Sequence, residues 1–273
     1  MRSILLIGLV VGCAGAEAMP APHEVTAAAA TQPVEAGFNP GETMAFEISI
    51  GGVLAGDAQL AVGEVGLVAG HRHVRVKSRA ETAGAVAMVK HIVDEATTEL
   101  DLETGHPISF DTVVETGDKH TFSRGTFTGN HADVTYSRDP ETPTEVVKPT
   151  TYTLSFGKME VHDAHSAMAQ IRNWRPAVGS ARTLYVMGGK RLWRVDLVYV
   201  GTDTIGTAVG NRAVVKLTGQ AFRARGNLST ETTTPTRVFT VYLSDDADRV
   251  PLRVVGKTEL GDIVMALTEY TRP

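Results

Sequence analysis

Two closely spaced histidines are the first residues in this chain whose types and spacing suit metal binding. His71 and His73 are two residues apart, so both imidazoles point to one face if the segment is extended. An imidazole pair binds a transition metal when further ligands converge on it. Arg75 and Lys77 follow on the same face and repel a cation. We therefore interpret this segment as a solvated basic strand face.

A second histidine pair flanks the start of a predicted helix. His162 and His165 are three residues apart in a chain that has nine histidines. Such a pair could bind a metal weakly, but a surface position at the helix entry is the favoured interpretation of both residues. We interpret the pair as surface residues, and the sequence predicts no metal site and no cofactor.

Arrangements typical of hydrolytic enzymes are also missing. No serine lies in a Gly-x-Ser-x-Gly sequence. The neighbouring carboxylates Asp94-Glu95 and Asp245-Asp246 would point to opposite faces of a strand. Trp174 and Trp193 could stack on a sugar, but filling the core is the simpler interpretation. We predict no catalytic residues and expect that the protein is not an enzyme.

Cys13 is the only cysteine of the chain and follows an apolar run without charge, residues 4–12, after Arg2. The run is too short to span a bilayer but suits the core of a signal peptide. The residues Val10-Val11-Gly12-Cys13 resemble the bacterial lipobox, which predicts lipidation of Cys13. Ala14 after the cysteine resembles the pattern of lipoproteins sent to the outer membrane. The alternative is cleavage after Ala18, which would give a soluble periplasmic product.

The part that follows the leader divides into a tether and a folded body. Residues 13–37 are rich in Ala, Pro, Thr and Glu without a periodic apolar pattern, which predicts a disordered tether after a signal peptide of residues 1–12. Residues 38–273 are predicted to form a single β-rich domain. The net charge of −5 excludes a nucleic-acid-binding surface of the usual basic kind.

Apolar side chains alternate along the body with a period of two, which is typical of half-buried strands. Met44, Phe46 and Ile48 share one face, and Val74 and Val76 share another. Further alternating runs cover residues 108–114, 193–200, 213–217, 238–243, 250–255 and 263–270. Strands at this spacing without long helices between them predict an all-β, mainly antiparallel fold, a strongly curved sheet that forms an open barrel or roll.

Two stretches interrupt the alternation. Residues 82–89 are rich in alanine and predict one or two helical turns. Residues 163–174 predict the best helix, which Asp163 caps and Pro176 ends. The segment 139–149 has three prolines, and we expect a loop there that separates two half-sheets.

Several short motifs resemble a bacterial family, the domain-of-unknown-function family 3108 (DUF3108), over about residues 38–271. The order and spacing of these motifs carry the resemblance. They are Asn39-Pro40-Gly41-Glu42, Ile50-Gly51-Gly52, Ala55-Gly56-Asp57-Ala58, Asp163 through Arg172 with its Asp-x-x-Ser-Ala start, Ser244-Asp245-Asp246, Arg249 through Arg253, and Gly261-Asp262-Ile263. The resemblance implies export and a mostly β fold, and it brings no established activity and no catalytic residues.

These observations lead to a non-catalytic protein of the bacterial cell envelope, anchored to the membrane through its lipidated N-terminus. The first hypothesis is that a curved sheet holds a lipid or another apolar ligand against its concave face. The alternative is a structural or adhesion module that binds an envelope protein or a glycan. A hydrolase of envelope polymers is the least favoured, because it needs a cleft in which carboxylates or histidines converge.

Overall fold

The computed structural model describes residues 37–68, 71–208, 210–258 and 261–273. Fifteen strands and two helices follow one another in these segments. The elements are β1 (Thr43–Ile50), β2 (Val53–Val68), β3 (His71–Thr82), α1 (Gly84–Val89), β4 (Ile92–Asp101), β5 (Pro107–Thr116), β6 (Lys119–Thr128), β7 (His131–Arg138), β8 (Thr150–Ser155), β9 (Val161–His162), α2 (Ala164–Asn173), β10 (Ala181–Gly188), β11 (Arg191–Thr207), β12 (Gly210–Ala224), β13 (Arg237–Ser244), β14 (Pro251–Thr258) and β15 (Gly261–Thr271).

All fifteen strands belong to one sheet, in which β1 lies at the centre. From β1 the chain runs outward strand by strand to β8, which is one edge of the sheet. It then continues through residues 156–160 to β9, the other edge, and returns strand by strand until β15 pairs with β1. Every pairing is antiparallel except that of β9 with β10. Because β8 and β9 are both edges, the sheet is not closed.

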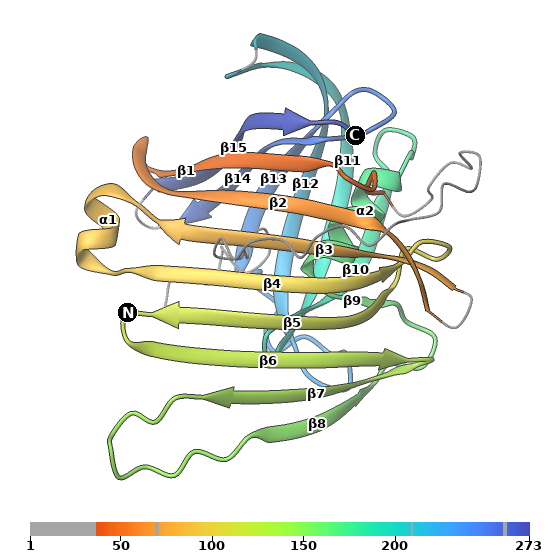
Figure 1. The fold of residues 1–273 in the computed structure, drawn as a ribbon. Coiled ribbons are helices and arrows are strands. Elements are labelled where there is room, and N and C mark those ends of the chain that lie inside the picture. Colours follow the sequence, from red (N-terminus) through yellow and green to blue (C-terminus); the bar gives the residue numbers. More distant parts are fainter. Residues whose placement is uncertain (1–36, 69–70, 209, 259–260) are drawn as a thin grey trace.

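The sheet curves so strongly that its two halves face each other. In Figure 1, β2–β8 run across the front and β11–β13 cross behind them, with α2 beside the crossing. The space between the halves holds apolar side chains. One cluster joins β1 to β10–β15 and α2, a second joins β5–β8 to β9–β12, and a third lies between Phe38, β2–β4 and α2. These clusters hold the halves together.

The predicted all-β fold, the curved open sheet and the two short helices are confirmed. Met44, Phe46 and Ile48 of β1 are buried, as are Val74 and Val76 of β3, so the alternation identified the inward faces. Helix α1 is only six residues long, and none of its residues is buried. Among the described residues, neither helix is long and apolar enough to cross a bilayer.

The prediction for residues 139–149 was half correct. They do form a loop, but it joins the paired strands β7 and β8 within the first half of the sheet. The passage between halves lies instead at residues 156–160. Three prolines mark a break in the strands, but they carry no information about which strands the break connects. The predicted signal peptide, Cys13 and all of the predicted tether except Gly37 lie outside the described residues.

Candidate functional site

Helix α2 begins with a reciprocal cap between two side chains. The Asp163 carboxylate accepts hydrogen bonds from the backbone N–H groups of His165 and Ser166, at 3.3 and 3.0 Å. The backbone N–H of Asp163 in turn donates to Ser166 Oγ at 3.0 Å. This capping box satisfies donors that the first helical turn leaves free. It explains the Asp-x-x-Ser spacing as a helix-start signal.

A chain of buried hydrogen bonds continues from this cap into the first half of the sheet. Thr98 of β4 donates to Asp163 Oδ2 and contacts His165 Nδ1 at 2.7 Å, and His165 Nε2 meets the hydroxyl of Ser78 on β3. Burial lowers the pKa of His165, so the ring is neutral at neutral pH. A serine, an imidazole and a carboxylate thus share one network, as in a hydrolase, but the Thr98 hydroxyl lies between the imidazole and the carboxylate, which are 3.8 Å apart. All of them are buried and their partners are supplied, so they fasten α2 to β3 and β4.

The other end of α2 holds a buried ion pair. Arg172 lies in the last turn and donates from both Nη atoms to the Glu42 carboxylate, at 2.5 and 3.0 Å. Glu42 also accepts from the Tyr270 hydroxyl at 3.0 Å and from the backbone N–H of Asn39 at 3.1 Å. Burial, together with the charge of Glu42, raises the pKa of Tyr270 to about 12. The bidentate geometry is the strong form of this pair.

The remaining donors of Arg172 are occupied by the loop between β13 and β14. Its Nε and Nη2 donate to the carbonyl of Asp248 at 3.1 and 3.0 Å. Asp246 shapes that loop, since its carboxylate accepts from Ser244 and from the backbone N–H groups of Asp248 and Arg249. Three of the motifs that carry the family resemblance therefore meet at one clamp. The clamp joins the first strand, the helix and the last hairpins.

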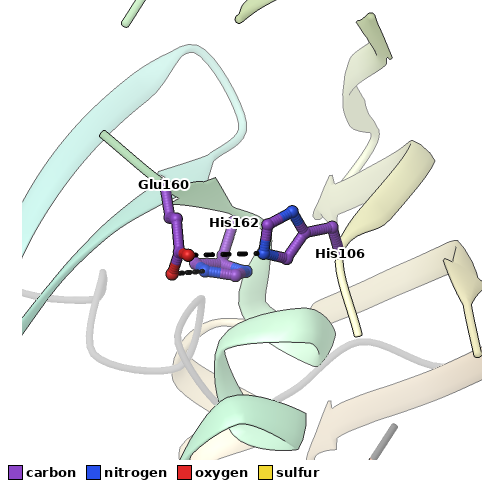
Figure 2. Close-up of side chains that lie close together, drawn as sticks. All are labelled: His106, Glu160 and His162. Carbon is purple, nitrogen blue, oxygen red and sulfur yellow. Dashed lines mark ion pairs between the residues drawn. The ribbon is translucent and has the colours of Figure 1, made fainter. Parts of the chain in front are cut away.

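A different arrangement lies just before α2, where two histidines and a glutamate converge from two segments (Figure 2). His106 ends the turn between β4 and β5, whereas Glu160 and His162 lie on the passage between the halves and on β9. His106 Nε2 is 3.8 Å from Glu160 Oε1, and His162 Nε2 is 3.9 Å from Glu160 Oε2. The two rings meet edge to face with centroids 5.3 Å apart. Two nitrogens and one carboxylate oxygen could thus bind one cation.

His162 is the residue at this cluster that lacks ordinary partners. Its side chain is 0% exposed, and neither ring nitrogen has a hydrogen-bond partner among the described residues. Burial, assisted by the nearby His106, lowers the pKa of His162 to about 4. The ring is therefore neutral at neutral pH and has a free lone pair, which is the form that binds a metal.

The histidine pairs that the sequence suggested do not form. His73 faces Glu99 at 3.7 Å, and the exposed His71 does not join it in a metal-binding group among the described residues. His162 and His165 diverge, the first toward His106 and the second toward Thr98. Both are buried, so the interpretation of this pair as surface residues was wrong. His106 was missed because it is 56 residues before His162 and only the fold joins them.

A polar hollow of about 460 Å³ lies where β7 ends and β8 begins. Ala132 and Val134 of β7 are buried against the core, and Tyr136 and Arg138 continue the same face of the strand beyond it. Lys190, from the turn between β10 and β11, lies 4.2 Å above the Tyr136 ring. Tyr152 also lines the hollow, and its buried hydroxyl has no hydrogen-bond partner among the described residues. The face of β7 that is apolar at Ala132 and Val134 is thus polar at the end of the strand.

Asp94 of β4 is another titratable group on the inward side of the sheet. It lies on the same face of the strand as the buried Thr98 and Leu100. Burial, and to a lesser extent the charge of Glu95, raises the pKa of Asp94 to about 7. The tryptophans, in contrast, fill space, because Trp193 is buried in the core and Trp174 packs against it.

Comparison with known proteins finds a similar fold in a protein that contains a domain of unknown function. A β-barrel-like protein of the domain of unknown function DUF1849 from Brucella abortus has a similar fold, with a TM-score of 0.54 and 11% identity. The match covers 86% of this chain and 98% of that one. The likeness concerns the fold alone.

Two further solved structures are less similar. One is a candidate exported protein with a YmcC-like fold from Bacteroides fragilis, with a TM-score of 0.38 and 8% identity, covering 86% of this chain and 97% of the other. The second is a candidate lipoprotein from Parabacteroides distasonis, with a TM-score of 0.34 and 9% identity, covering 85% and 96%.

Sequence comparison is more decisive than these structural matches. No curated protein has a detectable match to the chain. The profile of DUF3108, a family described as proteins of unknown function, matches residues 45–268. The match includes α2 with its Asp-x-x-Ser start and the two last hairpins. The chain therefore belongs to the DUF3108 family.

Proposed function

We propose that the protein is a non-catalytic binding module of the bacterial cell envelope that holds an acidic glycan in the hollow beside β7 and β8. The observation that carries this proposal is the composition of the hollow. Lys190 lies 4.2 Å from the centroid of the Tyr136 ring, and Lys148 adds a second cation to the lining. The one carboxylate of the lining, Glu145, is already paired with Arg138. Aromatic faces with nearby cations suit sugars that carry acidic groups.

An acidic glycan fits the structure better than the apolar ligand that the sequence first suggested. A lipid would need apolar surface that the protein leaves free. The apolar side chains between the two halves pack against one another in three clusters instead. Close-packed side chains leave little room for an acyl chain. The surface that stays accessible around Tyr136 is polar.

The envelope location rests on the leader-like residues 1–12 and on Cys13. Lipidation of Cys13 would tether the folded body to the membrane through residues 14–36. The Cys13→Ser variant should move from the membrane fraction to the soluble periplasmic fraction. If the variant stays with the membrane, the anchor is not at Cys13.

Glycan binding is tested by calorimetry with polygalacturonate as the acidic polymer and dextran as the neutral one. We expect polygalacturonate alone to bind, and Tyr136→Ala and Lys190→Ala each to weaken binding about tenfold or more. The control is Lys77→Ala, which removes an exposed lysine from β3. If polygalacturonate does not bind and native mass spectrometry finds a stoichiometric lipid, the glycan proposal is wrong and the apolar ligand replaces it.

A further inference from the structure

The cluster of His106, Glu160 and His162 has the composition of a transition-metal site. Its three candidate donor atoms lie within 4.8 Å of one another. Two imidazole nitrogens with one carboxylate oxygen suit Zn²⁺ and its neighbours, whereas Mg²⁺ and Ca²⁺ prefer oxygen ligands. Donors of a tetrahedral zinc site are roughly 3.4 Å apart. The observed 3.8 and 3.9 Å separations involve the two different oxygens of Glu160, so the exposed Glu160 and His106 side chains must move inward for the donor atoms to reach this value.

The state of His162 independently points to a ligand. Buried polar atoms are almost always hydrogen-bonded, and those that are not require an explanation. His162 is completely buried, yet neither of its ring nitrogens has a partner among the described residues. One nitrogen faces Glu160 and His106, and both of these side chains reach the surface, being 53% and 44% exposed. A cation could therefore enter from solvent and would satisfy that nitrogen.

We propose that His106, Glu160 and His162 form a binding site for one Zn²⁺ ion, with solvent at the fourth coordination position. Glu160 belongs to the passage between the halves, His162 to β9 in the second half, and His106 to the turn between β4 and β5 in the first half. The bound ion therefore links the two halves beside the open edge strand β9.

The surroundings of the cluster hold its ligands in place. Asp101 shapes the turn that ends at His106, since its carboxylate accepts from the backbone N–H groups of Glu103 and Thr104 at 2.9 and 2.8 Å. Gln170 of α2 donates to the carbonyl of Gly105 in the same turn at 3.3 Å. Such contacts behind the ligands reduce the motion that metal binding must restrict.

Arg182 is a cation that competes with the proposed ion for Glu160. Its Nη2 lies 3.7 Å from Glu160 Oε2, and it also donates to the Gln170 side chain at 2.9 Å. A guanidinium at this distance repels a divalent cation and reduces its affinity. Arg182→Gln should therefore bind Zn²⁺ more tightly than the unchanged protein. A clear loss of affinity in this variant would contradict the assignment of Glu160 as a ligand.

The direct test uses the full chain after treatment with a chelator and dialysis. We expect calorimetry to show one equivalent of Zn²⁺, and Co²⁺ to give the visible absorption of a tetrahedral or five-coordinate site. His106→Ala, Glu160→Gln and His162→Leu should each lower the affinity at least tenfold and reduce the Co²⁺ absorption. Added Zn²⁺ should raise the thermal midpoint of the unchanged protein but not that of these variants.

His91→Ala is the matched control. His91 Nε2 lies 3.8 Å from Glu81 Oε1, which reproduces one histidine–carboxylate pair of the site, and this pair is not among the metal-binding groups of the described residues. This variant should bind as the unchanged protein does. Glu160→Gln changes an exposed side chain, so its effect cannot be attributed to misfolding of the core. Absence of Zn²⁺ binding, or binding that survives in the Glu160→Gln and His106→Ala variants, would overturn the proposal.

Discussion

Helix α2 has a buried arginine in its last turn and a buried histidine just before its start. At the last turn, the Arg172 guanidinium meets the Glu42 carboxylate and the carbonyl of Asp248. Before the start, His162 is equally buried but has no hydrogen-bond partner among the described residues. Buried polar groups are almost always hydrogen-bonded, so the paired Arg172 is an ordinary structural group, whereas the unpaired His162 requires an explanation, which the proposed ion supplies. The contrast separates a structural clamp at the last turn of α2 from a candidate binding site just before its start.

Breaking the clamp should have the largest effect on stability. Arg172→Ala leaves the Glu42 carboxylate buried without its cation, and this should reduce the free energy of unfolding by about 3–5 kcal/mol. Urea denaturation followed by circular dichroism measures the loss. Lys257→Ala is the control, because it breaks an exposed pair with Asp262 and should cost less than about 1 kcal/mol. If Arg172→Ala and Lys257→Ala reduced the free energy of unfolding equally, the buried ion pair would be no more important for stability than the exposed one.

Lowering the pH should reduce the stability of the protein through His162, which lies just before the start of α2. The pKa of His162 is lowered from 6.5 in the unfolded chain to about 4 in the folded one, so the unfolded chain binds the extra proton between these values. Stability is therefore complete above about pH 6.5 and falls as the pH decreases toward 4, by about 3 kcal/mol from this residue. His165 also has a lowered pKa and contributes in the same direction.

His162→Leu tests this pH dependence. The leucine has no proton to gain, so the variant should lose less stability than the unchanged protein between pH 6.5 and 4.5. In a chelator at pH 7 its stability should be unchanged or slightly higher, since the substitution removes an unsatisfied polar group. Thermal midpoints across this pH range provide the measurement. A parallel decline in both proteins would assign the acid sensitivity to other groups.

Removing the helix cap should have an intermediate effect. Asp163→Ala loses the acceptor for the first turn of α2 and leaves Thr98 and His165 without their carboxylate, which should reduce stability by about 2 kcal/mol. Asp163→Asn keeps an acceptor oxygen and should recover part of the loss. The comparison is measured by urea denaturation at pH 7, and no difference between the two substitutions would argue against the cap.

Gln170→Ala should have the smallest effect on stability, below about 1 kcal/mol, because its hydrogen bonds are only partly buried. It should nevertheless weaken Zn²⁺ binding severalfold, since the turn that carries His106 loses its contact with α2. Calorimetry and urea denaturation of the same sample separate the two effects. A large loss of stability without a change in Zn²⁺ affinity would make Gln170 a purely structural residue.

The sequence alone determined the local structure of several elements of the protein. The period-two alternation of β1 and β3 identified their inward faces, and Asp163 and Pro176 marked both ends of α2, because these signals act over a few residues. Only the tertiary structure decided which distant residues meet. Glu42 finds Arg172 across 130 positions, and His106 finds His162, because strand order and the curvature of the sheet bring them together. No local pattern encodes that order, which follows from how the two halves pack their apolar faces against each other.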